Sequence, residues 1–320
     1  MKNEKKMPKI ALGTWSWGVG KAGGNQVFGN YLEAEDLRPV FEEAMKNGLN
    51  LIDTAFVYGM GESEKIIGEF VADVSREDVI LSTKFTPQFT KEEVEPVRKM
   101  LDGSLERLGT DYVDLYWIHN PADVEKWTPY LIPLVKEGKI GKVGVSNHNM
   151  EQIKKAEEIL SAEGIHLSAV QNHYSLLYRS SEDAGIIDFC REKGIDFFAY
   201  MVLEQGALSG KYDSKNPIPG ESERAEKYNP MFEHMDGLIS EMRSIGSKYG
   251  ASASQVAISW ALSKGVIPLI GMTDKKQVAE AAGAAKLKLT ADEYSALEKM
   301  AQQTDANTKG YWEKPMVKKI

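Results

Sequence analysis

Four residues of types that suit proton transfer lie at or just beyond short apolar segments of the sequence. Asp53 follows segment 49–52, Lys84 follows segment 79–83, His119 follows segment 113–118, and Tyr58 lies shortly beyond Asp53. A free tyrosine has a pKa of about 10, and a neighbouring ammonium lowers that pKa because it favours the phenolate. We therefore expect Tyr58 to donate a proton to a carbonyl oxygen, with Lys84 lowering its pKa and Asp53 keeping Lys84 charged.

His119 fits the same chemistry as a donor that orients the carbonyl and stabilises negative charge on its oxygen. None of the four side chains can supply a hydride, so a reduction would require a cofactor such as a nicotinamide nucleotide. Taken singly, each residue has an ordinary structural alternative. Asp53 could cap a loop, Lys84 could serve in an ion pair, His119 could be a core histidine, and Tyr58 could be a loop aromatic.

The elements that must position these residues follow a repeating pattern of short apolar runs and longer amphipathic stretches. This pattern is typical of βα units around a parallel sheet. The expected strands are 9–12, 49–52, 79–83, 113–118, 142–145, 168–170, 196–199 and 266–270. Helices are expected over 38–47, 94–108, 150–162, 181–193 and 253–264. Eight such units without a linker predict a (β/α)8 TIM barrel, an α/β fold in which residues 1–320 form a single domain.

Catalytic residues of such barrels gather at the carboxyl ends of the strands. We expect two irregular segments, the long loop 203–230 and the C-terminal tail 307–320, to lie near this mouth of the barrel. Substrate contacts are expected from Trp15, Tyr58, Phe85 and His119. The wider set of candidate aromatic wall residues, half of which we expect in the core, is Trp15, Trp17, Phe56, Phe85, Phe89, Trp117, Trp127 and Trp312.

Composition narrows the classes of partner. The chain has 320 residues and a formal net charge of −8, which argues against nucleic-acid or anionic-membrane binding. Cys190 is the sole cysteine, so an intramolecular disulfide and a cysteine-rich zinc site are excluded, and we expect no metal. No secretory leader and no membrane span are expected. These features predict a cytoplasmic protein and leave its oligomeric state open. The expected partner, a small carbonyl compound, follows from the four residues above.

A glycine pattern that resembles a dinucleotide fingerprint follows the first expected strand. Gly18, Gly20 and Gly23 spell G-x-G-x-x-G, but a true fingerprint opens a helix at once, and the residues from Gly24 onward are poor helix starters. We interpret this segment as a flexible loop over the barrel mouth.

Ordered motifs over most of the chain resemble those of the aldo-keto reductase family. They are LGT at 12–14, NLIDTA at 50–55 with YG at 58–59, LSTK at 81–84, DLYWIH at 114–119, GVSN at 144–147 and QN at 171–172. The resemblance implies reversible reduction of an aldehyde or ketone by NAD(P)H. It assigns Tyr58 as the acid, supported by Lys84 and Asp53, with His119 aligning the carbonyl.

The resemblance also implies a cofactor site. Ser146, Asn147 and Gln171 would hold the nicotinamide carboxamide, and Tyr200 would stack on its ring. The full set of expected cofactor contacts is Thr14, Trp15, Asp53, Ser146, Asn147, Gln171, Tyr200, Leu203, Gly206, Leu208, Gly210, Lys211, Gly271, Thr273, Gln277 and Glu280.

The preference for NADP(H) or NAD(H) depends on the end of the site that holds the adenosine. Thr273 stands where the family often places an arginine or lysine for the 2′-phosphate of NADP, but Lys275 and Lys276 are near. The N-terminus of a helix over 274–284 would also favour a phosphate. NADP(H) is therefore favoured and NAD(H) is possible.

Two other functions fit parts of the pattern. The first is a lyase in which Lys84 forms a Schiff base with a carbonyl substrate, which requires a lysine free of a tight carboxylate partner. The second is a nicotinamide-nucleotide sensor or a regulatory subunit that binds the nucleotide without turnover. Such a protein has no need of a proton donor.

Overall fold

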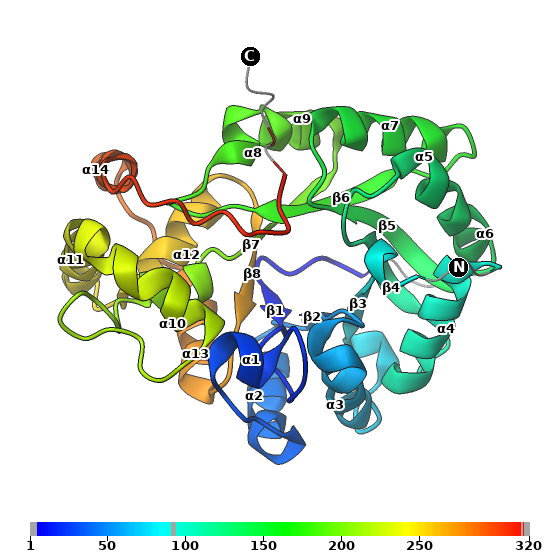
Figure 1. Cartoon of the computed structure of the whole chain (residues 1–320), viewed down its shortest axis with the longest axis horizontal. Helices are drawn as coiled ribbons and strands as arrows, with labels where there is room; N and C mark the ends of the chain where they lie inside the picture. Colours follow the sequence, from blue (N-terminus) through cyan, green and yellow to red (C-terminus); the bar gives the residue numbers. More distant parts are fainter. Residues whose placement is uncertain (1–4, 91–93, 315, 317–320) are drawn as a thin grey trace.

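Eight parallel strands close into one barrel in chain order, and the helices surround it (Figure 1). The computed structural model describes residues 5–90, 94–314 and 316. The strands are β1 Ala11–Gly13, β2 Leu51–Asp53, β3 Ile80–Phe85, β4 Val113–Ile118, β5 Ile140–Ser146, β6 Leu167–His173, β7 Asp196–Tyr200 and β8 Ile267–Gly271. The (β/α)8 architecture expected from the sequence is thereby confirmed.

Several strands extend farther toward the mouth than the apolar pattern predicts. β3 continues through Lys84, and β6 continues to His173 rather than stopping at Val170. The reason is that pairing between strands does not require apolar side chains. Lys84 pairs with Trp117, and His173 pairs with Tyr200. Polar residues therefore extend these two strands at their carboxyl ends, and their side chains can face the mouth.

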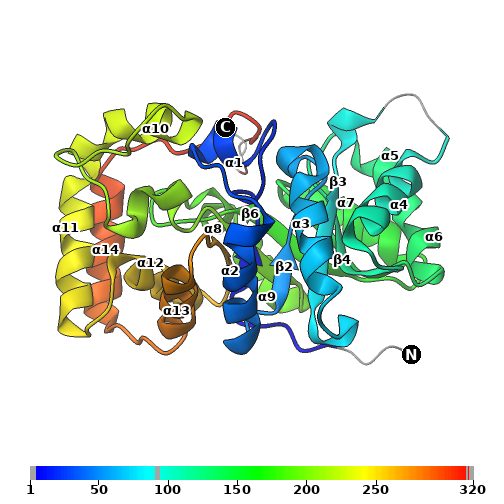
Figure 2. The ribbon, with the colours of Figure 1, turned by 90° about the horizontal axis from the view of Figure 1, so that it is seen from below.

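The helices form an outer ring, with α10 to α14 gathered on one side of the barrel (Figures 1 and 2). They are α1 Gly24–Phe28, α2 Ala34–Lys46, α3 Glu62–Val71, α4 Pro96–Leu108, α5 Val124–Trp127, α6 Leu131–Lys136, α7 Met150–Ser161, α8 Ser180–Asp183, α9 Ile186–Lys193, α10 Glu223–Tyr228, α11 Phe232–Lys248, α12 Ala253–Ser263, α13 Lys275–Ala284 and α14 Ala291–Gln303. Short 3₁₀ turns include η1 Tyr58–Gly61 and η5 Glu204–Ser209.

Two helical expectations were wrong. The single helix expected over 181–193 is divided into α8 and α9, because Gly185 adopts a φ of 71°, a left-handed conformation that interrupts a helix. The segment after Gly23, expected to stay irregular, opens the five-residue helix α1. This helix is closed by Gly29 with a φ of 70° and buries Val27.

The interior of the barrel is filled by side chains below the mouth. One buried cluster consists of Ala11, Leu51, Ile80, Leu115, Trp117, Ala169 and Phe198. The rings of Trp117 and Phe198 meet edge to face at 5.3 Å, an arrangement that aromatic pairs favour. Gly144 on β5 makes room for Trp117, since a Cβ at this position would lie 2.2 Å from its ring. The polar residues at the strand ends thus rest on a solid apolar floor.

Both irregular segments reach the mouth. Segment 203–230 contains η5 and α10, and the tail after α14 returns toward the middle of the barrel, near β7 (Figure 1). Tail residues 315 and 317–320 lie outside the described residues. Within the described ranges, no helix has both the length and the apolar character needed to cross a bilayer.

Candidate active site

Lys84 and Asp53 form a buried ion pair at the mouth of the barrel. Asp53 is the last residue of β2 and Lys84 projects from the neighbouring strand β3, so parallel pairing brings the two together. The Lys84 ammonium donates to Asp53 Oδ2 at 2.5 Å and to the carbonyl of Thr54 at 2.7 Å, and both side chains of the pair are at most 1% exposed. Burial alone lowers the pKa of Lys84, but Asp53 and Tyr58 together outweigh it, and the pKa is raised. Lys84 is therefore held as a cation.

Asp53 is itself held by neutral donors. Its Oδ1 accepts hydrogen bonds from the Ser82 hydroxyl at 2.7 Å and from the Gln171 amide at 3.3 Å. Ser82 in turn accepts a bond from the indole of Trp117, so the ion pair is joined to the floor of the barrel. Such additional hydrogen bonds are what make a buried ion pair tolerable, because they replace water around the carboxylate.

Tyr58 begins the 3₁₀ turn η1, and its hydroxyl lies 3.3 Å from the Lys84 ammonium. Its pKa is raised by burial. Lys84 works in the lowering direction but does not outweigh burial, and Asp53 adds to the rise. Lys84 thus lowers the pKa of Tyr58 as expected, but the combined effect of burial, Asp53 and Lys84 raises it. In this environment the phenol keeps its proton at neutral pH.

His119 follows β4 and faces the same group. Its ring lies 6.1 Å from the ring of Tyr58, centroid to centroid, and its Nδ1 lies 3.0 Å from the Thr86 hydroxyl. Burial, and after it the charge of Lys84, lowers the pKa of His119 well below its ordinary value. The imidazole is therefore neutral and can donate a hydrogen bond from only one nitrogen.

A second polar group lies across the mouth from Tyr58, at the ends of β5, β6 and β7. Asn147 donates to the His119 carbonyl at 3.0 Å, and the Tyr200 hydroxyl lies 2.6 Å from Asn147 Oδ1. Asn147 adopts a φ of 62°, which is uncommon for a residue other than glycine. Ser146 and Gln171 are the remaining residues of this group, and both line the same cavity.

One cavity of about 1290 Å³ connects these groups to the N-terminal end of α13. Of the residues that the sequence assigned to the site, those lining the cavity are Thr14, Trp15, Asp53, Tyr58, His119, Ser146, Asn147, Gln171, Tyr200, Leu203, Gly206, Gly210, Lys211, Gly271, Thr273, Gln277 and Glu280. Lys84 lies directly beneath it, in contact with Tyr58. The structure thus brings nearly all of the expected residues to one surface.

Phe85 and Leu208 are the exceptions. Phe85 is fully buried and packs against Trp127 at 5.1 Å between ring centroids, outside the barrel wall. Successive residues of a strand point to opposite faces, so Phe85 points outward because Lys84 points inward. The expectation that Phe85 contacts substrate was therefore wrong. The Leu208 side chain is also fully buried in the apolar core.

The aromatic walls come from fewer residues than the sequence offered. Trp15, Phe89 and Trp312 line the cavity, and so does Phe28 of α1, which the sequence did not single out. Trp15 packs edge to face against Phe28 at 5.4 Å and against Trp312 at 5.7 Å. Trp15 therefore connects α1, which follows Gly18–Gly23, with the C-terminal tail at the wall of the cavity.

The far end of the cavity carries a cation that the sequence did not single out. Arg243 of α11 lines it, together with Lys211 and Lys276. No local signal marked Arg243, because it lies in an ordinary amphipathic helix. The N-terminus of α13 is capped by the side chain of Asp274, which accepts a bond from the Gln277 amide. This carboxylate opposes an anion there, so the helix N-terminus is a poorer phosphate site than the sequence predicts.

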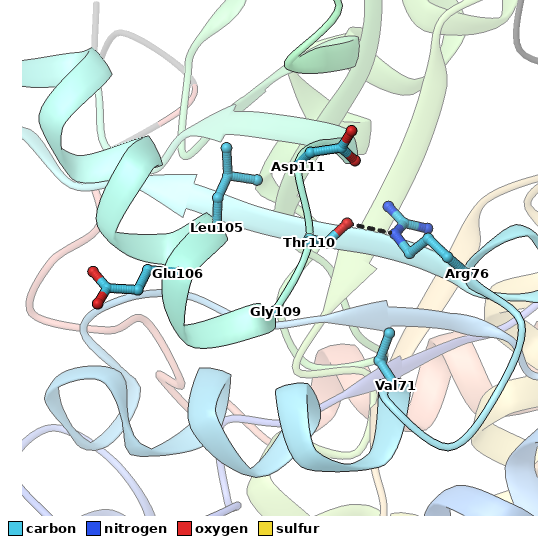
Figure 3. A pocket seen from close by; sticks show the side chains of 7 residues that line it. All are labelled: Val71, Arg76, Leu105, Glu106, Gly109, Thr110 and Asp111. Carbon is cyan, nitrogen blue, oxygen red and sulfur yellow. Dashed lines mark hydrogen bonds between the residues drawn. The ribbon is translucent and has the colours of Figure 1, made fainter.

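A second, open depression lies at the opposite end of the barrel (Figure 3). Its lining residues are Val71, Arg76, Leu105, Glu106, Gly109, Thr110 and Asp111. Arg76 donates to the Thr110 hydroxyl at 3.0 Å and pairs with Asp114, so its charge is already engaged. Because these residues precede β3 and β4, they belong to the end of such barrels that serves stability. Among the described residues, no group of histidine, cysteine or acidic side chains is arranged to hold a metal ion.

Sequence comparisons relate this chain to a family of known proteins. A sequence model described as "Aldo/keto reductase family" matches residues 9–302. The chain is 30% identical to a chloroplastic pyridoxal reductase of Arabidopsis thaliana, over 92% of this chain and 83% of that protein. It is 31% identical to an aldo-keto reductase of Strobilurus tenacellus, over 92% and 89% of the two chains.

Solved structures of related proteins have the same fold. A glycerol dehydrogenase of Gluconobacter oxydans superposes with a TM-score of 0.78 and 27% identity, covering 96% of this chain and 95% of that one. An aldo-keto reductase of Klebsiella pneumoniae, solved with NADPH, shares the fold with a TM-score of 0.73 and 24% identity, over 92% and 91% of the two chains. From the family match and the curated relatives, we conclude that this chain belongs to the aldo/keto reductase family and is an NAD(P)-dependent oxidoreductase.

Proposed function

We propose that this protein reduces an aldehyde or ketone to an alcohol, reversibly, with a hydride from NADPH and a proton from Tyr58. The observation that carries the proposal is the contact of the Tyr58 hydroxyl with a buried ammonium, Lys84, at 3.3 Å on the floor of the large cavity. The volume of that cavity exceeds the roughly 300–1,000 Å³ of most ligand pockets, as a site for both a dinucleotide and a substrate requires.

The four residues of the first group have separate roles in this reaction. The nicotinamide, when bound, supplies the hydride that adds to the carbonyl carbon. Tyr58 gives its proton to the carbonyl oxygen, so that the phenol O–H bond breaks as the alcohol O–H bond forms. The phenolate left behind is stabilised by the adjacent Lys84 cation, which Asp53 holds in place. A Thr86 hydroxyl that donates to His119 Nδ1 leaves the imidazole proton on Nε2, available to orient the carbonyl oxygen.

The remaining lining residues suit a nicotinamide dinucleotide. Ser146, Asn147 and Gln171 bring a hydroxyl and two amides together, which matches the donor and acceptor of a carboxamide. Gly210, with a φ of 75°, keeps the backbone open beside Ala253, since a Cβ would lie 2.5 Å from the Ala253 Cβ. We assign the segment from Leu203 to Lys211 to the pyrophosphate, and the residues from Gly271 to Glu280 to the adenosine.

NADPH is our proposed cofactor because cations line the adenosine end of the cavity. Lys276 lines it together with Thr273, and Arg243, which pairs with Asp213 at 2.8 Å, lines the same cavity. A cofactor without a 2′-phosphate would need no cation there. The Klebsiella pneumoniae relative was solved with the same nucleotide. The acidic side chains Asp274 and Glu280 lie at the same end, and they are the reason that NADH stays an alternative cofactor.

The substrate class is a carbonyl compound with an apolar or ring-bearing body. Trp15, Phe28, Phe89 and Trp312 provide flat apolar walls near Tyr58, and aromatic walls stack well on rings. One curated relative is named as a pyridoxal reductase, and pyridoxal is a ring-bearing aldehyde. Pyridoxal is therefore a natural first member of a substrate panel.

The two alternative functions fit less well. A Schiff-base lyase needs a neutral lysine amine, but Lys84 is tightly paired with Asp53 and its pKa is raised. A nucleotide sensor needs no proton donor, so the buried contact between Tyr58 and Lys84 would serve no purpose in it. The sensor alternative predicts binding of nucleotide without turnover of any carbonyl compound.

A fluorescence titration with NADPH and with NADH tests the proposal. We expect saturable quenching of tryptophan emission with tighter binding of NADPH, followed by NADPH oxidation on addition of suitable aldehydes. Trp312→Phe should reduce the quenching amplitude because Trp312 lines the cavity. The matched control Trp127→Phe should not, because Trp127 packs outside the barrel wall. Absence of binding by both nucleotides would reject the reductase and the sensor together.

A further inference from the structure

A buried cluster of opposite charges lies directly behind Tyr200 and takes no part in the proposed chemistry. His173, the last residue of β6, is fully buried. Its Nε2 lies 2.9 Å from Glu204 Oε1, and its Nδ1 lies 2.9 Å from Glu313 Oε1. Glu204 belongs to η5, whereas Glu313 comes from the C-terminal tail. One imidazole therefore joins the barrel wall, the loop after β7 and the tail.

The geometry requires this imidazole to be charged. Carboxylate oxygens accept but do not donate, so both ring nitrogens must carry protons to bond both glutamates. Burial lowers the pKa of His173, but Glu204 and Glu313 outweigh it and raise the pKa to about 9. The titratable and charged groups that surround His173 are Glu204, Glu313, Tyr178, Tyr200 and Tyr228, with Lys227 near Glu204.

Glu204 is the fixed member of the cluster. It accepts hydrogen bonds from the hydroxyls of Ser175, Tyr228 and Thr308 in addition to its contact with His173. Burial raises the pKa of Glu204, but His173, Ser175 and Lys227 together lower it overall, so Glu204 is an anion. The position of Glu204 is set by these partners, of which Ser175 and Tyr228 lie outside the tail, so the His173–Glu204 pair does not depend on Glu313.

Glu313 connects the His173–Glu204 pair to Tyr200, a residue of the proposed cofactor site. The Tyr200 hydroxyl lies 2.8 Å from Glu313 Oε1 and 2.6 Å from Asn147 Oδ1, and the Trp312 indole donates to the same hydroxyl at 3.3 Å. The Tyr200 ring stacks on the His173 ring, with centroids 5.5 Å apart and planes 23° apart. Tyr200 is thus held at its hydroxyl and against one face, while it lines the cavity.

We propose that Glu313 is a positioning residue for the nicotinamide, which completes the cofactor site when the tail docks on the His173–Glu204 pair. It acts through Tyr200 and Asn147, the residues that the proposed function places at the nicotinamide, and the inference rests on that function. The adjacent Trp312 is brought over the cavity by the same contact. A single docking event thus fixes the ring against which the nicotinamide stacks and closes one wall of the substrate space.

The first test compares NADPH binding by the parent, Glu313→Gln and the matched tail variant Lys314→Gln. Glu313→Gln keeps the shape of the side chain and removes its charge. Because hydrogen bonds to charged groups are stronger than those between neutral groups, we expect roughly tenfold weaker NADPH binding. The turnover number at saturating NADPH should change much less, and Lys314→Gln should match the parent.

A double-mutant cycle separates positioning from a general structural effect. Tyr200→Phe keeps the ring and removes the hydroxyl through which Glu313 acts. In this background Glu313→Gln should weaken NADPH binding by less than about threefold, because the coupling has already been lost. An equal loss in both backgrounds would show that Glu313 acts on overall stability, and it would overturn the proposal.

The pH profile provides a readout that a structural role would not move. The parent should lose NADPH affinity as the pH rises through about 9, where His173 becomes neutral and no longer holds both carboxylates. In Glu313→Gln the loss should occur at lower pH, because one carboxylate no longer favours the cation. If Glu313→Gln bound NADPH as tightly as the parent and lost affinity at the same alkaline pH, the inference about Glu313 would be refuted while the proposed function would stand. A parent that binds no nicotinamide nucleotide would instead refute the proposed function.

Discussion

Removal of the Lys84 charge should lower both the free energy of unfolding and the reductase activity, and a second substitution at Asp53 should restore only the first. In Lys84→Met the Asp53 carboxylate stays buried and keeps only its bonds to Ser82 and Gln171. Breaking a buried ion pair from one side costs about 3–5 kcal/mol, because an uncompensated charge remains. We therefore expect the free energy of unfolding to fall by about this amount, with loss of carbonyl reduction because no cation stabilises the Tyr58 phenolate.

The double variant Lys84→Met/Asp53→Asn removes both charges. An asparagine can still accept from Ser82 and Gln171, and replacement of both members of a buried pair by neutral groups is often near neutral in stability. We expect the double variant to regain most of the lost stability and none of the lost activity. Urea unfolding monitored by circular dichroism measures the first quantity, and NADPH oxidation with an aldehyde measures the second.

The matched control is Lys65→Met, which breaks an exposed pair. Lys65 and Glu62 lie 2.6 Å apart with side chains 56% and 40% exposed, and such pairs contribute about 0–1 kcal/mol. Its stability and activity should stay close to those of the parent. The reasoning about the buried pair would be refuted if Lys84→Met were as stable as Lys65→Met, or if the double variant were no more stable than the single one.

Three further results are expected. Thr273→Arg should raise the preference for NADPH over NADH by roughly tenfold, because it adds a charge-assisted bond to a phosphate; an unchanged ratio of the two dissociation constants would place the 2′-phosphate elsewhere. Gly144→Ala should lower the urea midpoint, since its Cβ would lie 2.2 Å from the Trp117 ring and overpacking costs about 1–3 kcal/mol; a midpoint equal to that of the parent would contradict this. The pKa of His173 is raised from 6.5 to about 9 in the folded protein, so its stabilisation, on the order of 3 kcal/mol, is complete below pH 6.5 and lost as the pH rises through 9. Thermal unfolding between pH 6 and 10 should show this decline in the parent and a flatter profile in His173→Gln.

The sequence located the first group of site residues because their signal is local. Asp53, Lys84 and His119 each end an apolar segment, and parallel strands bring such positions to one mouth. The same logic failed for Phe85, because a list of strand-end residues does not say which face each side chain takes. Only the inward direction of Lys84 settles that its neighbour points outward into the ring of helices.

Long-range contacts could not be read from the sequence. The two glutamate partners of His173 lie 31 and 140 residues away along the chain, and no local pattern connects them. The net pKa of Tyr58 was also beyond the sequence, because burial, which decides its direction, depends on the whole mouth. The break at Gly185 illustrates a smaller limit, since a glycine inside an amphipathic pattern is compatible with a continuous helix until its φ is known.

The central claim is that Tyr58 delivers the proton in a nucleotide-dependent carbonyl reduction. The most direct measurement is the turnover number of Tyr58→Phe at saturating NADPH and aldehyde, with NADPH affinity measured on the same preparation. General acids contribute roughly 10²–10⁴-fold, so the account predicts a loss within this range with nearly unchanged NADPH affinity. A variant that reduces carbonyl compounds as fast as the parent would contradict it.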